Sequence, residues 1–116
     1  GFKILYSDGT NVVDVTADLG NITTGTINSG AITTSSDITA TGHILPGATD
    51  TYDLGSTSAV WRDIYTGDLH LSNEAKNQGN KVDGTKGNWT LQEGQDDIFM
   101  INNISGEKFK IKLEKV

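Results

Sequence analysis

The sequence predicts an all-β fold: an intertwined trimeric β-stem, built as a triangular β-prism or a β-helix-like coil, followed by a small antiparallel β domain. Two observations carry this prediction. Single isoleucines recur every five or six positions between residues 22 and 44, separated by Thr, Ser, Asn and Gly. Residues 108–113, in the terminal stretch 108–116, alternate between lysine and apolar side chains, which is the period of a half-buried strand. We expect the stem to span residues 1–45 and the β domain residues 46–116.

The regular isoleucines indicate the local structure of the stem, and we expect them to form its trimer core: Ile22, Ile27, Ile32, Ile38 and Ile44. An amphipathic helix needs about three apolar residues in every two turns, so this wider spacing favours short extended segments joined by tight bends. We expect Gly25, Gly30 and Gly42 to provide a positive φ at such bends.

The sparseness of the apolar residues predicts that several chains build the stem together. One isoleucine per layer is too little apolar surface to close a core within one chain. A solenoid made by one chain uses roughly 20 residues or more per turn, and this stretch provides barely one turn. Three chains would bring three isoleucines together on a common axis. The composition also suits a flexible tether, but a tether does not need an isoleucine at regular intervals.

The β domain is expected to contain four strands, at residues 68–72, 88–92, 98–103 and 108–114. The last two strands form a hairpin, because Gly106 lies where a short hairpin loop requires a positive φ. Between the first two strands, residues 73–87 are polar and rich in Asn, Lys and Gly. Such a composition predicts a long exposed loop.

A group of large side chains precedes these strands, and we expect it to pack at the end of the stem: Tyr52, Leu54, Trp61, Ile64 and Tyr65. Gly55 is expected to end an extended segment with a positive φ, and Ser56 or Ser58 to cap a single helical turn through Trp61. Burying one large aromatic side chain contributes on the order of 2 to 3 kcal/mol, so this cluster would strengthen the stem. An exposed tryptophan would instead suit a sugar ring, and Trp89 beside the loop is the better candidate.

Two groups of motifs link the chain to a known class of proteins. The first combines Tyr-Asp-Leu-Gly with Trp-Arg-Asp-Ile-Tyr, in Ile44-Leu45-Pro46-Gly47, residues 50–56 and residues 61–65. It resembles a repeat of tail-fibre and other virion structural proteins of tailed bacteriophages. The second comprises residues 66–71, residues 87–90 and residues 105–109. It is similar to carboxy-terminal modules of fibre-like proteins from phages of marine bacteria. The resemblance implies a homotrimer in the virion that contacts other fibre or virion proteins.

The expected function is therefore a structural segment of a homotrimeric phage fibre, whose carboxy-terminal domain registers and locks the trimer. The alternative is a receptor-binding tip that recognises a bacterial surface glycan or protein through Lys76, Lys81, Lys86 and Trp89. Both functions can coexist in a distal module. An enzyme is not expected, because no Ser/His/Asp spacing indicates a nucleophile, although some phage spikes hydrolyse polysaccharide with paired acids.

Composition and charge argue against several other classes of function. A formal net charge of −6, without a local cluster of Lys or Arg, disfavours nucleic-acid binding. No apolar stretch approaches the length of a membrane span, so membrane insertion is not expected. The chain contains no cysteine and therefore no disulfide. No cofactor or metal is expected, although a threefold axis could bring together three copies of His43 or His70.

Overall fold

A computed structural model describes residues 25–116, and within this range it contains one four-stranded antiparallel sheet and no helix. The chain divides into two compact units, Gly1–Ala40 and Thr41–Val116. The sheet lies in the second unit. The all-β class is thus confirmed for the described residues, and the trimeric arrangement stays a prediction.

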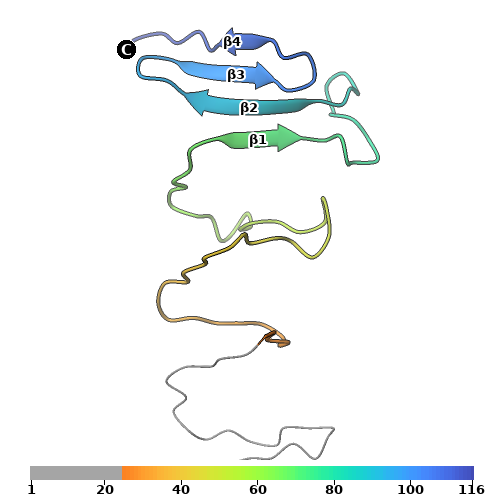
Figure 1. The fold of residues 1–116 in the computed structure, drawn as a ribbon, viewed down its shortest axis with the longest axis vertical. Coiled ribbons are helices and arrows are strands. Elements are labelled where there is room, and N and C mark those ends of the chain that lie inside the picture. The colour runs from red at the N-terminus through yellow and green to blue at the C-terminus, as the bar shows by residue number, and fades with distance from the viewer. Residues whose placement is uncertain (1–24) are drawn as a thin grey trace, which may run out of the picture. The chain divides into compact units, whose positions relative to one another are not determined.

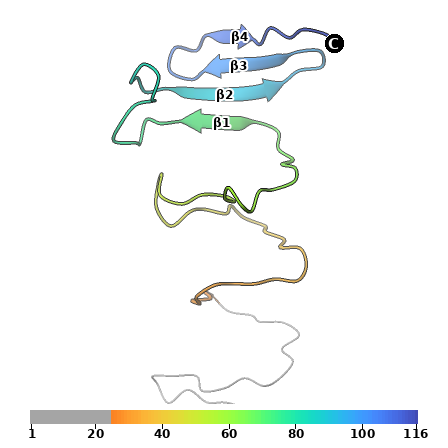
Figure 2. The same cartoon turned by 180° about the vertical axis from the view of Figure 1, so that it is seen from behind.

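The sheet is a meander in which the strands follow one another in sequence and in space (Figure 1). The strands are β1 (Leu69–Ser72), β2 (Asn88–Glu93), β3 (Ile98–Asn102) and β4 (Lys108–Lys110). Each strand pairs antiparallel with the next, and the view from behind shows the same order (Figure 2). All four predicted strands are confirmed, although β4 ends at Lys110, earlier than expected.

The turn between β3 and β4 has the geometry that the sequence predicts. Gly106 has a φ of 79°, and its amide donates a hydrogen bond of 2.8 Å to the carbonyl oxygen of Asn102. The side-chain Oδ1 of Asn102 accepts hydrogen bonds from the amides of Ile104 at 3.0 Å and Ser105 at 3.2 Å. Asn102 therefore holds the turn from inside, while Gly106 supplies the left-handed backbone that it requires.

The register of the strands gives the sheet one apolar and one polar face, because paired residues of antiparallel strands share a side. Leu91 of β2, for example, pairs with Leu69 on one side and with Met100 on the other. We call this side the apolar face, and its apolar residues are Leu69, Leu71, Trp89, Leu91, Ile98, Met100, Phe109 and Ile111. The opposite side, which we call the polar face, carries His70, Thr90, Gln92, Lys108 and Lys110, together with two apolar residues, Phe99 and Ile101.

The sheet lacks a hydrophobic core of its own. Among residues 25–116 no apolar side chain is buried, and Thr90, with 4% of its surface exposed, is the single buried residue. On the apolar face, Leu69, Leu71 and Phe109 keep 45%, 51% and 47% of their surface exposed. A small sheet needs its hydrophobic face packed against something else for independent stability. One chain alone does not provide that cover within the described residues.

In residues 25–46, bends alternate with four-residue segments that belong to no helix or strand. These segments are residues 26–29, 31–34, 37–40 and 43–46. Each contains one isoleucine in its second position, and these isoleucines are Ile27, Ile32, Ile38 and Ile44. The predicted bends are therefore present in this stretch, and the extended conformation of the segments between them stays a prediction.

The isoleucines of these segments are exposed in a single chain, with exposed fractions of 61% for Ile27, 70% for Ile32, 71% for Ile38 and 81% for Ile44. Their place in a trimer core stays a prediction, and Ile22 lies outside the described residues. Gly30 and Gly42 lie at bends but do not adopt a positive φ, so that prediction is wrong for both. The chain makes these bends without a left-handed residue.

The segment after Leu54 makes a tight turn. Gly55 has the expected positive φ of 83°. The amide of Ser56 donates to the carbonyl oxygen of Ala59 at 3.0 Å, and the amide of Ala59 donates back to Ser56 at 3.3 Å. The backbones of Ser56 and Ala59 therefore pair with each other. The prediction of a helical turn at this point is wrong. The hydroxyl of Ser56 still accepts a bond of 3.1 Å from the Ala59 amide.

The five side chains of the expected aromatic cluster are exposed to solvent in a single chain. The exposed fractions are 68% for Tyr52, 79% for Leu54, 62% for Trp61, 71% for Ile64 and 93% for Tyr65. Trp61 does lie beside Gly55, where a β-carbon would come within 3.4 Å of its Cδ1 atom. Packing of these five side chains at the end of the stem stays a prediction for the assembled protein.

The local topology of the sheet predicts that it forms without the stem. Every strand pairs with its neighbour in sequence, so no pairing depends on residues before β1. We expect residues 61–116 alone to fold and trimerise, whereas residues 1–45 alone should do neither. Circular dichroism and light scattering of both fragments test this. A folded, trimeric fragment 1–45 beside an unfolded fragment 61–116 would reverse the assignment.

Candidate functional site

The long loop between β1 and β2 is closed at its base by one asparagine. The amide of Asn73 donates to the carbonyl oxygen of Gly87 at 3.2 Å, and the amide of Gly87 donates to the side-chain Oδ1 of Asn73 at 2.7 Å. The side-chain Nδ2 of Asn73 also donates to the carbonyl oxygen of Thr85 at 3.3 Å. Asn73 thereby holds the ends of the loop together just beyond the last paired residues of the strands.

The tip of the loop is a compact turn built around Asn80 and Asp83. Oδ1 of Asn80 accepts the amides of Val82 at 2.8 Å and Asp83 at 3.0 Å. Oδ1 of Asp83 accepts bonds from the Thr85 amide at 3.0 Å, the Thr85 hydroxyl at 2.7 Å and Nδ2 of Asn80 at 2.7 Å. Gly84 adopts a φ of 75°, which suits glycine. The loop is therefore ordered by its own hydrogen bonds.

The hydrogen bonds at the tip favour the charged form of Asp83. The largest cause is the backbone amide of Thr85, followed by the Thr85 hydroxyl and the Asn80 side chain, and together they lower the pKa of Asp83 below its ordinary value of 3.8. Beside this acidic turn, Val82 is almost fully exposed, at 96% of its surface.

The three predicted receptor-contacting lysines differ in their surroundings. Nζ of Lys76 lies 3.0 Å from Oδ1 of Asp50. Nζ of Lys86 donates to the backbone carbonyl oxygens of Glu74, at 3.3 Å, and of Lys76. Lys81 makes no hydrogen bond or ion pair within residues 25–116, and its side chain is exposed at the tip. Lys76 and Lys86 thus stabilise the loop, whereas the ammonium group of Lys81 is available to contact a ligand.

Trp89 belongs to the sheet rather than to the loop. Its ring lies on the apolar face, with its centroid 5.7 Å from that of Phe109 and the planes tilted by 44°. A β-carbon at Gly87 would come within 3.2 Å of Nε1 of Trp89, so the absence of a side chain at Gly87 leaves room for the indole. Trp89 is half-buried, and its use as a receptor contact stays a prediction.

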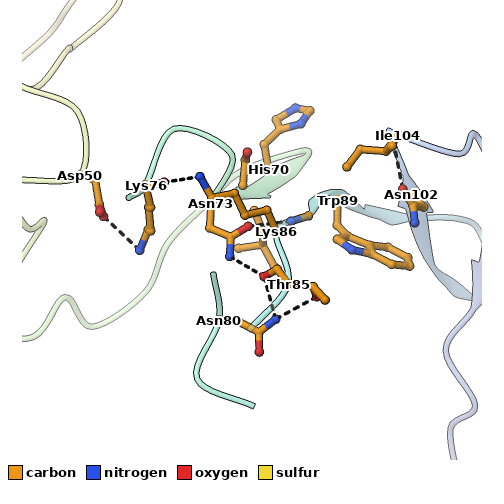
Figure 3. A pocket seen from close by; sticks show the side chains of 13 residues that line it. Asp50, His70, Asn73, Lys76, Asn80, Thr85, Lys86, Trp89, Asn102 and Ile104 are labelled. Atoms are coloured by element: carbon orange, nitrogen blue, oxygen red, sulfur yellow. Dashed lines mark hydrogen bonds and ion pairs between the residues drawn. The ribbon is translucent and has the colours of Figure 1, made fainter. Parts of the chain in front are cut away.

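An open hollow lies beside the base of the loop (Figure 3). The Lys76–Asp50 ion pair, the Lys86 side chain and the bonds between Asn80 and Thr85 are visible around it. Trp89 and Ile104 supply apolar surface on another part of its wall. A hollow of mixed amide, charged and aromatic surface suits a hydroxylated ligand better than an apolar one.

The polar face of the sheet carries a continuous hydrogen-bonded network. The hydroxyl of Thr90 lies 2.9 Å from Nδ1 of His70 and accepts a bond of 2.8 Å from Nδ2 of Asn103. Nδ2 of Asn103 also donates to Oδ1 of Asn88 at 2.9 Å, and Nδ2 of Asn88 donates to Oε2 of Glu74 at 2.7 Å. Either group can be the donor in the bond between Thr90 and His70, because the roles depend on the tautomer of His70.

The other predicted chemical groups do not converge on a second site. No cluster of three or more His, Cys, Asp or Glu side chains that could hold a metal ion occurs in the described part of the chain. Several carboxylates have basic or amide partners instead: Asp63 lies 3.3 Å from Arg62, Asp97 lies 3.9 Å from Lys110, and Asp68 accepts a bond of 2.9 Å from Gln92. The expectation that the protein is not an enzyme stays a prediction.

The comparisons with known proteins give no match to this chain, whether with family models, with curated proteins or with solved structures. Residues 25–116 contain no helix that is long and apolar enough to cross a membrane.

Sequence reasoning missed the asparagines that organise the site: Asn73, Asn80, Asn88 and Asn103. A signal was present in the spacing of Asn80, Asp83, Gly84 and Thr85, because Asn and Asp side chains favour turns that bond their own backbone two or three residues on. The composition of the loop shows only that it is polar. It does not show that the polar groups are satisfied by one another.

The lowered pKa of Asp83 predicts how the tip responds to acid. Because the folded loop favours the carboxylate, its contribution to loop order is present above pH 3.8 and is lost as the pH falls through the lowered pKa. We expect the amide resonance of Thr85 to titrate with a midpoint below 3.8 in an NMR pH series. Asp83→Asn keeps an acceptor oxygen and should remove this titration. A midpoint at or above 3.8 would contradict the geometry.

Proposed function

We propose that this chain is a structural segment of a homotrimeric bacteriophage fibre, in which the carboxy-terminal β domain registers and locks the three chains. The observation that carries the proposal is that the chain forms an ordered sheet without burying any apolar side chain among residues 25–116. A fold with this property needs other chains to complete its core.

The isoleucine pattern supports the same proposal from the other part of the chain. In an extended conformation, each segment of four residues would span about 13 Å, which suits one edge of a narrow triangular layer. The isoleucine occupies the same position in every segment, so three chains in register would present three isoleucines per layer. The bends between the segments would be the corners of the prism.

The energy available from assembly is large compared with the stability of one small domain. Full burial of a large apolar side chain contributes about 1.5 to 3 kcal/mol. The eight apolar side chains of the apolar face retain enough exposed surface to gain on the order of 5 kcal/mol per chain. Since whole domains are stable by about 5 to 15 kcal/mol, assembly would decide whether the sheet persists.

The assignment to a phage virion rests on the resemblance of residues 44–116 to fibre proteins. An elongated, disulfide-free trimer would hold together through packing and strand pairing alone, which fits a chain without cysteine. Its partners would be two further copies of itself and the neighbouring fibre or virion proteins.

The mass of the protein in solution tests the trimer directly. We expect light scattering to give three times 12.4 kDa, about 37 kDa. Ile27→Asp with Ile32→Asp would place up to six like charges near the axis, so desolvation and repulsion should abolish assembly. Asn28→Asp with Thr33→Asp is the matched control, because each neighbouring residue points to the other side of the extended segment. A trimeric isoleucine variant with unchanged melting would refute the axial placement.

A second function, recognition of a bacterial surface, is favoured by the tip of the loop. Val82 and Lys81 are exposed on a turn that its own hydrogen bonds hold in place. Such a preordered turn loses little conformational entropy on binding, and three copies would add their weak contacts through multivalency. The ligand would be a hydroxylated or acidic glycan, or a protein, on the host surface.

Shortening the loop separates recognition from assembly. Replacing residues 75–86 by a Gly-Ser turn should abolish binding to host cells while leaving the trimer mass and melting temperature nearly unchanged. Lys81→Glu provides a milder variant that keeps the whole turn. Loss of the trimer on shortening would show that the loop is structural, and full retention of cell binding would refute the recognition function.

A further inference from the structure

We infer that the apolar face of the sheet is the surface on which three copies of the β domain meet, so that the polar face points outward. The inference rests on the proposed function and specifies which surface performs it. It makes the interface of the β domain a sheet face, with Leu91 and Met100 at its centre.

The partner that packs against the apolar face must be present whenever the sheet is folded. Within the described residues of the unit Thr41–Val116, nothing buries Leu69, Leu71 or Phe109, which are 45%, 51% and 47% exposed. A cover that is needed for folding has to be a permanent partner rather than a transient ligand. Another copy of the same chain is always present at the same time and place. It is therefore the partner that we infer for the apolar face.

The chemistry of the face agrees with this occupant. Met100, Trp89 and Phe109 are residue types that protein interfaces favour, while charged residues are depleted at interface centres. Glu93 is the one charged residue of β1 to β4 on this side, and it lies at the end of β2. Like faces can therefore meet without bringing like charges together at the centre. A strongly charged partner would find no complementary group there.

The polar face, in contrast, is already satisfied within one chain. Thr90 is hydrogen-bonded to both His70 and Asn103, and Gln92 donates to Asp68 at 2.9 Å. Turning this face to the axis would bury the network and the nearby Lys108 at a desolvation cost. Turning it to water keeps these bonds and leaves two apolar residues, Phe99 and Ile101, on the outer side, against the eight apolar residues of the apolar face.

This orientation has a consequence for the histidines. His70 pairs with Thr90 on the polar face, and it therefore lies on the outside of the trimer. Three copies of His70 then cannot converge on the threefold axis to hold a metal ion. The outward side instead presents Lys108 and Lys110 beside Phe99.

Single cysteines test the orientation, because the chain has no cysteine of its own. Met100→Cys and Ile101→Cys are matched: the two residues are neighbours on β3, both are half-buried in one chain, and they lie on opposite faces. In the full chain we expect the Met100→Cys thiol to react with a maleimide at least about tenfold more slowly, since a buried group reacts only through local opening. Both thiols should react equally fast in denaturant.

A second pair of cysteine variants keeps the orientation testable if a variant of the first pair fails to fold. Phe109→Cys and Lys108→Cys lie on the edge strand β4, where both side chains are exposed in a single chain. We expect the same slower reaction at Phe109→Cys. Light scattering of each variant before labelling separates the outcomes. A trimer with equal or reversed rates overturns the orientation and leaves the trimer intact, whereas a monomeric wild-type chain overturns the proposed function and the orientation with it.

Discussion

An ordered sheet with one uncovered apolar face is the constraint on which the rest of this protein depends. Its strands pair in sequence order, and the polar groups of its turns are hydrogen-bonded. Nevertheless, no apolar side chain among residues 25–116 is buried in a single chain. Backbone hydrogen bonds give such a sheet its register, but they contribute little net stability without burial. Folding and association would then be one process, and the stability of the protein would depend on its concentration.

The segments with regular isoleucines and the sheet differ in how well their sequences specify an alignment of chains. The segments around Ile27 and Ile32 repeat one small apolar group at a fixed interval, which provides little information about register. The sheet carries varied side chains, including Trp89 and Phe109, in tilted contact. Varied shapes specify one alignment better than repeated identical ones, so in the proposed trimer the domain with the less regular sequence would be the better one to align the three chains.

The elements that could be predicted from the sequence are those encoded over short distances. The alternation of apolar and polar residues predicts the strands, and Gly106 predicts the turn between β3 and β4. The helical turn after Ser56 was predicted from a capping residue, but the backbone groups of Ser56 and Ala59 bond each other instead. The bends at Gly30 and Gly42 show that a glycine is not evidence of a positive φ.

The candidate site depended on pairings that composition does not reveal. Lys86 looks like a free cation in the sequence, but it is held by the carbonyl oxygens of Glu74 and Lys76. The position of Trp89 on the apolar face follows from its pairing with Leu71, which requires the register of β1 and β2. Its location beside the loop in sequence therefore did not indicate its role in the sheet.

The lysines of β4 bear on how far assembly can proceed. β4 is an edge strand, and its outer backbone groups are open to pairing with a strand of another molecule. Lys108 and Lys110 alternate along this edge, and Lys112 follows. Adding the same strand from a second molecule would bring like charges side by side, which disfavours growth into a continuous ribbon. The lysines would thus disfavour edge-to-edge aggregation, so that the proposed contact between sheet faces could close at a finite number of chains.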